Sequence, residues 1–259
     1  MITDLNLSSN PIGNEGIEFL KEPLSFQTQT IRNLNISNCE FTAHGAEEIF
    51  RAVSATRITK LCMSKNQIGD DKVTTGRMCE TLWKNRSIEH LELDECMIRD
   101  QGGIGIGEAL LRGSALRYCS LRKNDISDEG AIRIAQGIEH DGRLLKELYL
   151  GWNEISDTGG EVLGKCLLKN RVLEKLDLSN NKLKNSSATV FIVSLKRNQY
   201  IKLLNLDDNM INSQLAKKVQ VFIKSNRGKA TEQKNEQLTA RKEVIQNQLR
   251  GWDLDWTKS

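Results

Sequence analysis

The stretch LYLGWNEI, Leu148 to Ile155, has the apolar spacing of a buried strand followed by a turn. Leu148, Leu150 and Ile155 fit the positions that face a core. Tyr149 and Trp152 stand between them, so they face water if the leucines are buried. Large aromatic side chains on a wet surface indicate a binding function, because such residues supply much of the energy of protein interfaces.

The same apolar frame recurs along the chain. Relative to Asn153, leucines precede by eight, five and three residues (Leu145, Leu148 and Leu150), and Ile155 follows by two. Eight consecutive segments fit this frame, and successive reference positions are 27 to 30 residues apart. Such a period is the signature of a repeat protein. The reference residues are Asn10, Cys39, Asn66, Cys96, Asn124, Asn153, Asn181 and Asn209.

A helical pattern follows each frame. Most repeats have a glycine six residues after the reference and apolar residues at ten and fourteen, as in Leu163 and Leu167. This i, i+4 spacing predicts one buried helix face per repeat. Each unit is therefore a strand, a turn and a helix, and stacking joins the units into one core. The reference asparagine is expected to satisfy turn backbone groups and to link to the next repeat, because its amide both donates and accepts.

The pattern LxxLxLxxN or LxxLxLxxC, with a full helix in each second half, resembles the ribonuclease-inhibitor class of leucine-rich repeats from Ile2 to Lys224. The resemblance implies an α/β solenoid of about eight repeats, a curved horseshoe with a parallel sheet on its concave face and helices on its convex face. We assign residues 1–228 to this solenoid and residues 229–259 to a C-terminal helical cap and tail. The class includes enzyme inhibitors, immune sensors, GTPase-activating proteins and actin-capping proteins, so its function stays open.

Composition narrows the classes of partner. The 259 residues carry a formal net charge of only +3, which favours neither nucleic acid nor a membrane surface. The chain has no apolar run long enough to span a bilayer and does not start like a signal peptide. Its six cysteines form no CxxC pair, so we expect free thiols, no metal and a cytoplasmic location. Cys119 fits a core position, and Cys79 and Cys166 fall in predicted helices.

Two features look catalytic but have simpler interpretations. The glycine-rich run 102–107, GGIGIG, lacks the Lys-Ser/Thr of a phosphate loop and fits the helical half of its repeat. His90, Glu92 and Asp94 alternate onto one strand face and could form an acid/base or metal cluster. A solvated acidic binding patch is the favoured interpretation. We therefore predict no catalytic residues, no cofactor and no small-molecule substrate.

The residues six, four and two positions before each reference, with the rim residues beside them, form the expected concave surface. We predict that this surface binds a folded protein, possibly an enzyme, for inhibition, scaffolding or sensing. We also expect the chain to be monomeric when alone. The alternatives are a GTPase-activating protein, a bacterial effector acting in host cytoplasm, a purely stabilising aromatic stack, and binding through the C-terminal tail. The predicted contact residues are His90, Glu92, Asp94, Glu95, Tyr118, Arg122, Lys123, Glu147, Tyr149, Trp152, Lys175, Asp177, Asp207 and Asp208.

Overall fold

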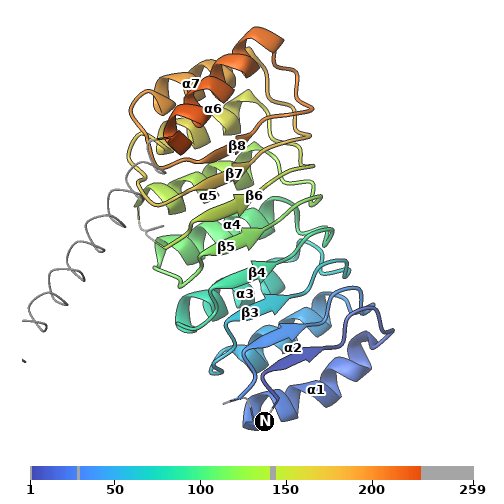
Figure 1. The fold of residues 1–259 in the computed structure, drawn as a ribbon. Helices are drawn as coiled ribbons and strands as arrows, with labels where there is room; N and C mark the ends of the chain where they lie inside the picture. The colour runs from blue at the N-terminus through green and yellow to red at the C-terminus, as the bar shows by residue number, and fades with distance from the viewer. Residues whose placement is uncertain (1, 28–29, 141–143, 229–259) are drawn as a thin grey trace, which may run out of the picture.

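The computed structural model describes residues 2–27, 30–140 and 144–228, and these form a solenoid of stacked strand–turn–helix units (Figure 1). Eight parallel strands pair in sequence order, from β1 to β8, into one open sheet. The helices cover the opposite, convex side of the sheet (Figure 1). The predicted leucine-rich-repeat architecture of about eight repeats is thus confirmed. The cap and tail predicted for residues 229–259 lie outside the described residues.

Each of the strands β1 to β8 is three residues long, and the helices α1 to α7 have 10 to 15 residues. The strands are β1 (Asp4–Asn6), β2 (Asn33–Asn35), β3 (Lys60–Cys62), β4 (His90–Glu92), β5 (Tyr118–Ser120), β6 (Glu147–Tyr149), β7 (Lys175–Asp177) and β8 (Leu203–Asn205). The helices are α1 (Gly13–Gln27), α2 (Ala43–Val53), α3 (Lys72–Lys84), α4 (Arg99–Leu111), α5 (Asp128–His140), α6 (Asp157–Cys166) and α7 (Asn185–Leu195). Residues 213–228 are also helical.

The core follows the predicted frame in the interior repeats. Leu148, Leu150 and Ile155 are fully buried, as are their counterparts in neighbouring repeats. The first repeat departs from the prediction. Ile2, assigned to a core position, is 65% exposed, and Leu5 is only partly buried. The physical reason is that each repeat buries its leucines against both neighbours, and within the described residues no repeat packs on the outer side of β1.

The reference asparagines form a ladder that joins consecutive repeats. Asn153 Nδ2 donates to Leu121 O at 2.9 Å and to Leu150 O at 3.0 Å. Its Oδ1 accepts from the backbone N–H groups of Asn124 at 3.1 Å and Ile126 at 3.0 Å. One side chain therefore satisfies its own turn and the turn of the preceding repeat. The predicted role in linking repeats is confirmed, but the predicted direction was wrong, because the asparagine bonds to the preceding repeat and not to the next one.

A second polar ladder lies four residues after the reference position. Asp128 Oδ1 accepts from the N–H groups of Ser156 at 2.8 Å and Gly159 at 2.9 Å, at the start of the next helix. Asp100 does the same for the start of α5, and Asp157 for the start of α7. Each carboxylate thus caps the next helix, where backbone N–H groups lack partners within the helix.

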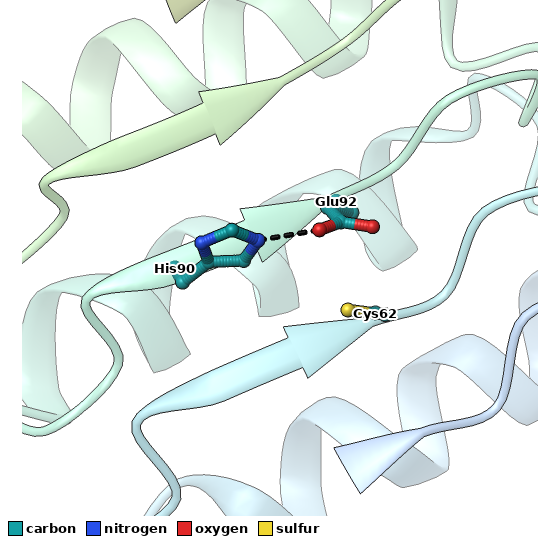
Figure 2. A group of neighbouring side chains, drawn as sticks. All are labelled: Cys62, His90 and Glu92. Atoms are coloured by element: carbon teal, nitrogen blue, oxygen red, sulfur yellow. Dashed lines mark hydrogen bonds and ion pairs between the residues drawn. The ribbon is translucent and has the colours of Figure 1, made fainter. Parts of the chain in front are cut away.

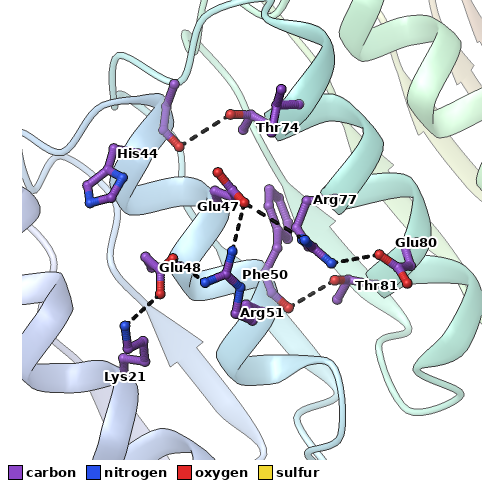
Figure 3. Close-up of polar contacts among 12 residues, drawn as sticks. Lys21, His44, Glu47, Glu48, Phe50, Arg51, Thr74, Arg77, Glu80 and Thr81 are labelled. Carbon is purple, nitrogen blue, oxygen red and sulfur yellow. Dashed lines mark hydrogen bonds and ion pairs between the residues drawn. The ribbon is translucent and has the colours of Figure 1, made fainter.

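The first three helices on the convex side are joined by polar contacts (Figure 3). Glu48 is buried and receives Lys21 of α1 at 2.8 Å and Arg51 of its own helix at 2.8 Å. The hydroxyl of Thr81 in α3 donates to Phe50 O in α2 at 2.9 Å. These contacts hold the spacing of the convex helices.

Helices α4 and α5 instead approach through glycine. A Cβ added at Gly107 would lie 2.4 Å from Arg133 O, and one at Gly137 would lie 2.7 Å from Gly107 O. Within the run 102–107, Gly103 and Gly107 lie against α5 and Gly105 lies against α3, and the helical placement of the run is as predicted.

Candidate functional site

The concave surface is set by the register of the sheet. His90 in β4 pairs with Tyr118 in β5, and Tyr118 pairs with Glu147 in β6. Tyr149 pairs with Ser120 in β5 and with Asp177 in β7. Side chains at paired positions of parallel strands point to the same face, which places these residues together on the concave side.

Three rings and one guanidinium form a continuous stack across three strands. The rings of His90 and Tyr118 are parallel, with centroids 3.9 Å apart and planes 5° apart. The ring of Tyr118 lies 5.1 Å from that of Tyr149, at a tilt of 40°. The Arg122 guanidinium lies 4.3 Å from the centroid of Tyr149 on the same surface. We call His90, Tyr118, Tyr149 and Arg122 the aromatic platform.

Polar contacts hold Tyr149 and Arg122 of the platform in place. Tyr149 Oη donates to Glu147 Oε2 at 2.7 Å. Arg122 donates to Asp177 Oδ2 through Nη2 at 2.9 Å and through Nε at 3.3 Å. Burial, followed by the bond to the Glu147 carboxylate, raises the pKa of Tyr149, so its phenol remains a hydrogen-bond donor at neutral pH. The platform is therefore rigid before any partner arrives.

Trp152 follows Tyr149 by three residues and is 55% exposed. Its backbone has a φ of 58°, in the left-handed region that a bulky residue occupies only at a cost. All eight residues preceding a reference position share this conformation, and two of them are asparagines, Asn38 and Asn180. Asparagine tolerates this region better, so the tryptophan is not the residue that the turn itself favours.

Asp94 and Asp177, two of the predicted contact residues, accept hydrogen bonds from other residues of the chain. Asp94 Oδ1 accepts from Ser120 Oγ at 2.6 Å and from the Arg122 N–H at 2.8 Å. Asp177 is buried, and besides Arg122 it accepts from Ser179 Oγ at 2.8 Å. These two carboxylates are internal acceptors that position their neighbours on the concave face.

The other charged residues form pairs on or beside the platform. Lys123 Nζ lies 3.3 Å from Glu95 Oε1 and 5.7 Å from the centroid of the Trp152 ring. Lys175 Nζ lies 2.9 Å from Glu147 Oε1. Asp207 and Asp208 are exposed beyond the last strand, and Asp207 lines a hollow together with Arg122 and Tyr149 of the aromatic platform.

Cys62 is the concave residue that the sequence reasoning passed over. It pairs in register with Glu92, and its thiol lies in a group with His90 and Glu92 whose ligand atoms are all within 4.8 Å of one another (Figure 2). The signal was available, because Cys62 and Glu92 both stand four residues before a reference position. The other five cysteines each fit a reference position, a core position or a predicted helix, and Cys62 was not assigned to any of these.

The surroundings of this group shift the pKa values of Glu92 and Cys62 in opposite directions. His90 Nε2 lies 2.5 Å from Glu92 Oε1, and Lys60 Nζ lies 3.2 Å from the same oxygen. The His90 bond, with help from Lys60, outweighs burial and lowers the pKa of Glu92 to about 2. Burial and the Glu92 charge raise the pKa of Cys62 to about 12. A neutral thiol is a poor nucleophile, so the arrangement disfavours cysteine-based catalysis.

The chain is similar to proteins built from leucine-rich repeats. The family model described as "Leucine Rich repeat" matches residues 1–21, 84–107, 116–135, 143–164 and 169–191. Ribonuclease inhibitor of Mus musculus is 28% identical over 172 residues, which are 66% of this chain and 37% of that protein. NACHT, LRR and PYD domains-containing protein 14 of Mus musculus is also 28% identical over 66% of this chain, and the match covers 17% of its length.

Among solved structures, internalin C2 of Listeria monocytogenes aligns with a TM-score of 0.49 and 19% identity, covering 82% of this chain and 74% of that one. The chain thus spans about a third of the length of the ribonuclease inhibitor that it matches. The matched segments fall on the first repeat and on the fourth to seventh repeats, and the parallel strands continue through the second and third repeats between them. The chain is a leucine-rich-repeat solenoid, and its repeats resemble those of the ribonuclease-inhibitor type.

Proposed function

We propose that this chain is a protein-binding module, and that a folded partner docks on the aromatic platform and Trp152 of its concave face. The observation that carries the proposal is Trp152, a large aromatic that is more than half exposed in a backbone conformation that disfavours it. Unfavourable local conformations concentrate at functional sites, where another gain offsets their cost. Relatives named as ribonuclease inhibitors support a module that binds another protein without catalysis.

The rigidity of the platform supports the same function. Tyr149 is fixed between Tyr118, Arg122 and Glu147, so little side-chain freedom remains to be lost on binding. Tyrosine, tryptophan and arginine are also the residue types most often found at the energetic centre of interfaces. The pairs Glu95–Lys123 and Glu147–Lys175 lie beside these anchors, where they would orient a charged partner.

The internal roles of Asp94 and Asp177 refine the set of contacts. Replacing either one would disturb Arg122, so a loss of binding would not identify a contact. Glu95 is exposed and is the better probe of electrostatic steering. We expect Glu95→Lys to change the association rate, with an effect that shrinks as salt rises.

The chain offers a variant that separates binding from folding. Trp152→Asn places at this turn the residue that stands there in two other repeats, at Asn38 and Asn180. We expect the variant to be at least as stable as wild type, because asparagine relieves the left-handed strain. We also expect it to bind its partner about 30-fold more weakly, which corresponds to the roughly 2 kcal/mol of a hot-spot residue.

The partner is first captured from source-cell extract with immobilised wild type, identified by mass spectrometry, and then purified for affinity measurements. Phe19→Ala is the matched control, because Phe19 is an aromatic on the convex helix α1 and is 82% exposed. It should bind like wild type. If Trp152→Asn and Tyr149→Ala both keep full affinity while Phe19→Ala loses it, the partner binds the convex side and the proposal fails.

A further inference from the structure

We propose that Cys62, His90 and Glu92 form a binding site for a divalent transition-metal ion, best suited to zinc, on the concave face, where the site shares His90 with the aromatic platform. The three side chains come from β3 and β4, at positions that the sheet register places together. Each offers one ligand atom, and these atoms are mutually within 4.8 Å (Figure 2). This inference goes beyond protein binding and does not depend on it.

The donor set selects the class of ion. A thiolate, an imidazole nitrogen and a carboxylate oxygen are the ligands found in zinc sites, whereas calcium and magnesium take oxygen ligands. A thiolate and a carboxylate also balance the charge of a divalent cation. Three protein ligands leave a fourth tetrahedral position open, as in zinc sites that accept an additional ligand.

The fourth position has room on the concave side. A hollow of about 330 Å³ extends from the first strands to this group, and Cys62, Glu92, Lys60 and Asn35 are among its lining residues. Water or a side chain from a docked partner fits in such a space. Cys62 is nearly buried at the wall of the hollow, so its thiol is held at one end of the site.

The ligands require only small movements. His90 is already oriented by its parallel stack on Tyr118. Ligand atoms around tetrahedral zinc are roughly 3.3 to 3.6 Å apart, given bonds of about 2.0 to 2.3 Å. The 2.5 Å contact between His90 Nε2 and Glu92 Oε1 would therefore open by about 1 Å to admit the ion. A neutral His90 binds through Nε2 with its proton on Nδ1, so the binding step releases one proton to solvent, that of the Cys62 thiol.

Lys60 is the group that opposes the ion. Its ammonium lies 3.2 Å from Glu92 Oε1, and its side chain is 42% exposed, so it can move away into solvent. Removing this charge should favour a cation at the site. Lys60→Gln is therefore expected to bind zinc more tightly than wild type, a gain of affinity that a merely structural cysteine–histidine contact does not predict.

The test uses the full chain, reduced and stripped of metal, titrated with Co²⁺ as a spectroscopic probe. We expect one ion per chain and an ultraviolet thiolate-to-cobalt charge-transfer band that Zn²⁺ abolishes by displacement. Cys62→Ser and His90→Gln should each weaken binding by more than about 10-fold, since even residues that only support a ligand have effects of that size. Cys79→Ala, a cysteine in α3 outside this group, is the matched control and should keep the band.

A second measurement needs no variant. Zn²⁺ should slow the alkylation of Cys62 in the folded wild type, as measured on its peptide by mass spectrometry, and leave the rate at Cys79 unchanged. Absence of the charge-transfer band, a band that survives Cys62→Ser, or equal alkylation of Cys62 with and without Zn²⁺ would overturn the proposal. None of these results bears on partner binding by Trp152.

Discussion

Asn153→Ala tests whether the asparagine ladder holds the repeats together. The side chain is almost fully buried between the turns of two repeats. Its loss removes the partners of the Asn124 and Ile126 N–H groups and of Leu121 O. Leu150 O remains satisfied, because Asn181 Nδ2 also donates to it at 2.9 Å. Three buried backbone groups are therefore left without these bonds.

Each buried group left without a partner costs about 1 to 3 kcal/mol, and entry of water lowers the sum. We expect Asn153→Ala to reduce the free energy of unfolding by at least about 3 kcal/mol, a large part of the roughly 5 to 15 kcal/mol of an ordinary domain. The measurement is urea unfolding followed by far-ultraviolet circular dichroism, with the denaturant dependence compared between variants.

Two further variants calibrate this result. Asn153→Cys introduces the residue found at Cys39 and Cys96, where the thiol of Cys96 donates to Met63 O at 3.4 Å. It keeps a donor and loses the acceptor, so its loss should be intermediate. Asn35→Ala removes one local acceptor, for the Ser37 N–H at 3.1 Å, and should cost less than about 1 kcal/mol. An Asn153→Ala loss no larger than that of Asn35→Ala would refute the reasoning.

Three other expectations concern the glycine contact, the aspartate ladder and the cysteines. Gly107→Ala should lower the free energy of unfolding in urea by about 1 to 3 kcal/mol, because the added Cβ would meet the backbone of Arg133. Gly76→Ala should raise it by up to about 1 kcal/mol, because a Cβ at position 76 has no atom within 4 Å. Equal effects of the two variants would contradict the close contact between α4 and α5. Burial raises the pKa of Asp157, but hydrogen bonds from Ser186 and Ser187 and from the Lys184 N–H outweigh it, so the pKa is lowered. The stability that the Asp157 carboxylate contributes is therefore present above its ordinary pKa of 3.8 and is lost as the pH falls through the lower pKa of the folded state. Asp157→Asn should reduce the free energy of unfolding more at pH 6 than at pH 3. A larger loss at pH 3 would contradict the lowered pKa. Alkylation of the denatured chain without reductant should label all six cysteines, and a missing pair would reveal a disulfide.

The sequence was sufficient for the fold because one frame specifies both the strand and the helix. Leu148 and Leu150 on one side and Tyr149 on the other follow directly from strand alternation. The exposure of Ile2 was missed because the frame assumes a neighbour on each side of every repeat. The aspartate ladder was also missed, since a carboxylate at the start of a helix has a local explanation and its bond to the next repeat depends on the stacking.

The site was predictable as a surface but not as a set of contacts. Alternation and period placed Tyr118, Tyr149 and Arg122 together. Side-chain partners depend on rotamers, which the period does not determine, so the internal bonds of Asp94 and Asp177 could not be foreseen. The left-handed turn at Trp152 follows from the backbone of every repeat and became apparent only in the structure.

No described helix is long and apolar enough to cross a membrane. The most direct measurement places a photoreactive benzoylphenylalanine at position 152 or, as a control, at position 19 on the convex side. After irradiation in source-cell extract, mass spectrometry identifies any cross-linked protein. We expect position 152 to capture one protein, with capture abolished by excess wild-type chain, and position 19 to capture none. Competed capture at position 19 with none at position 152 would contradict the account.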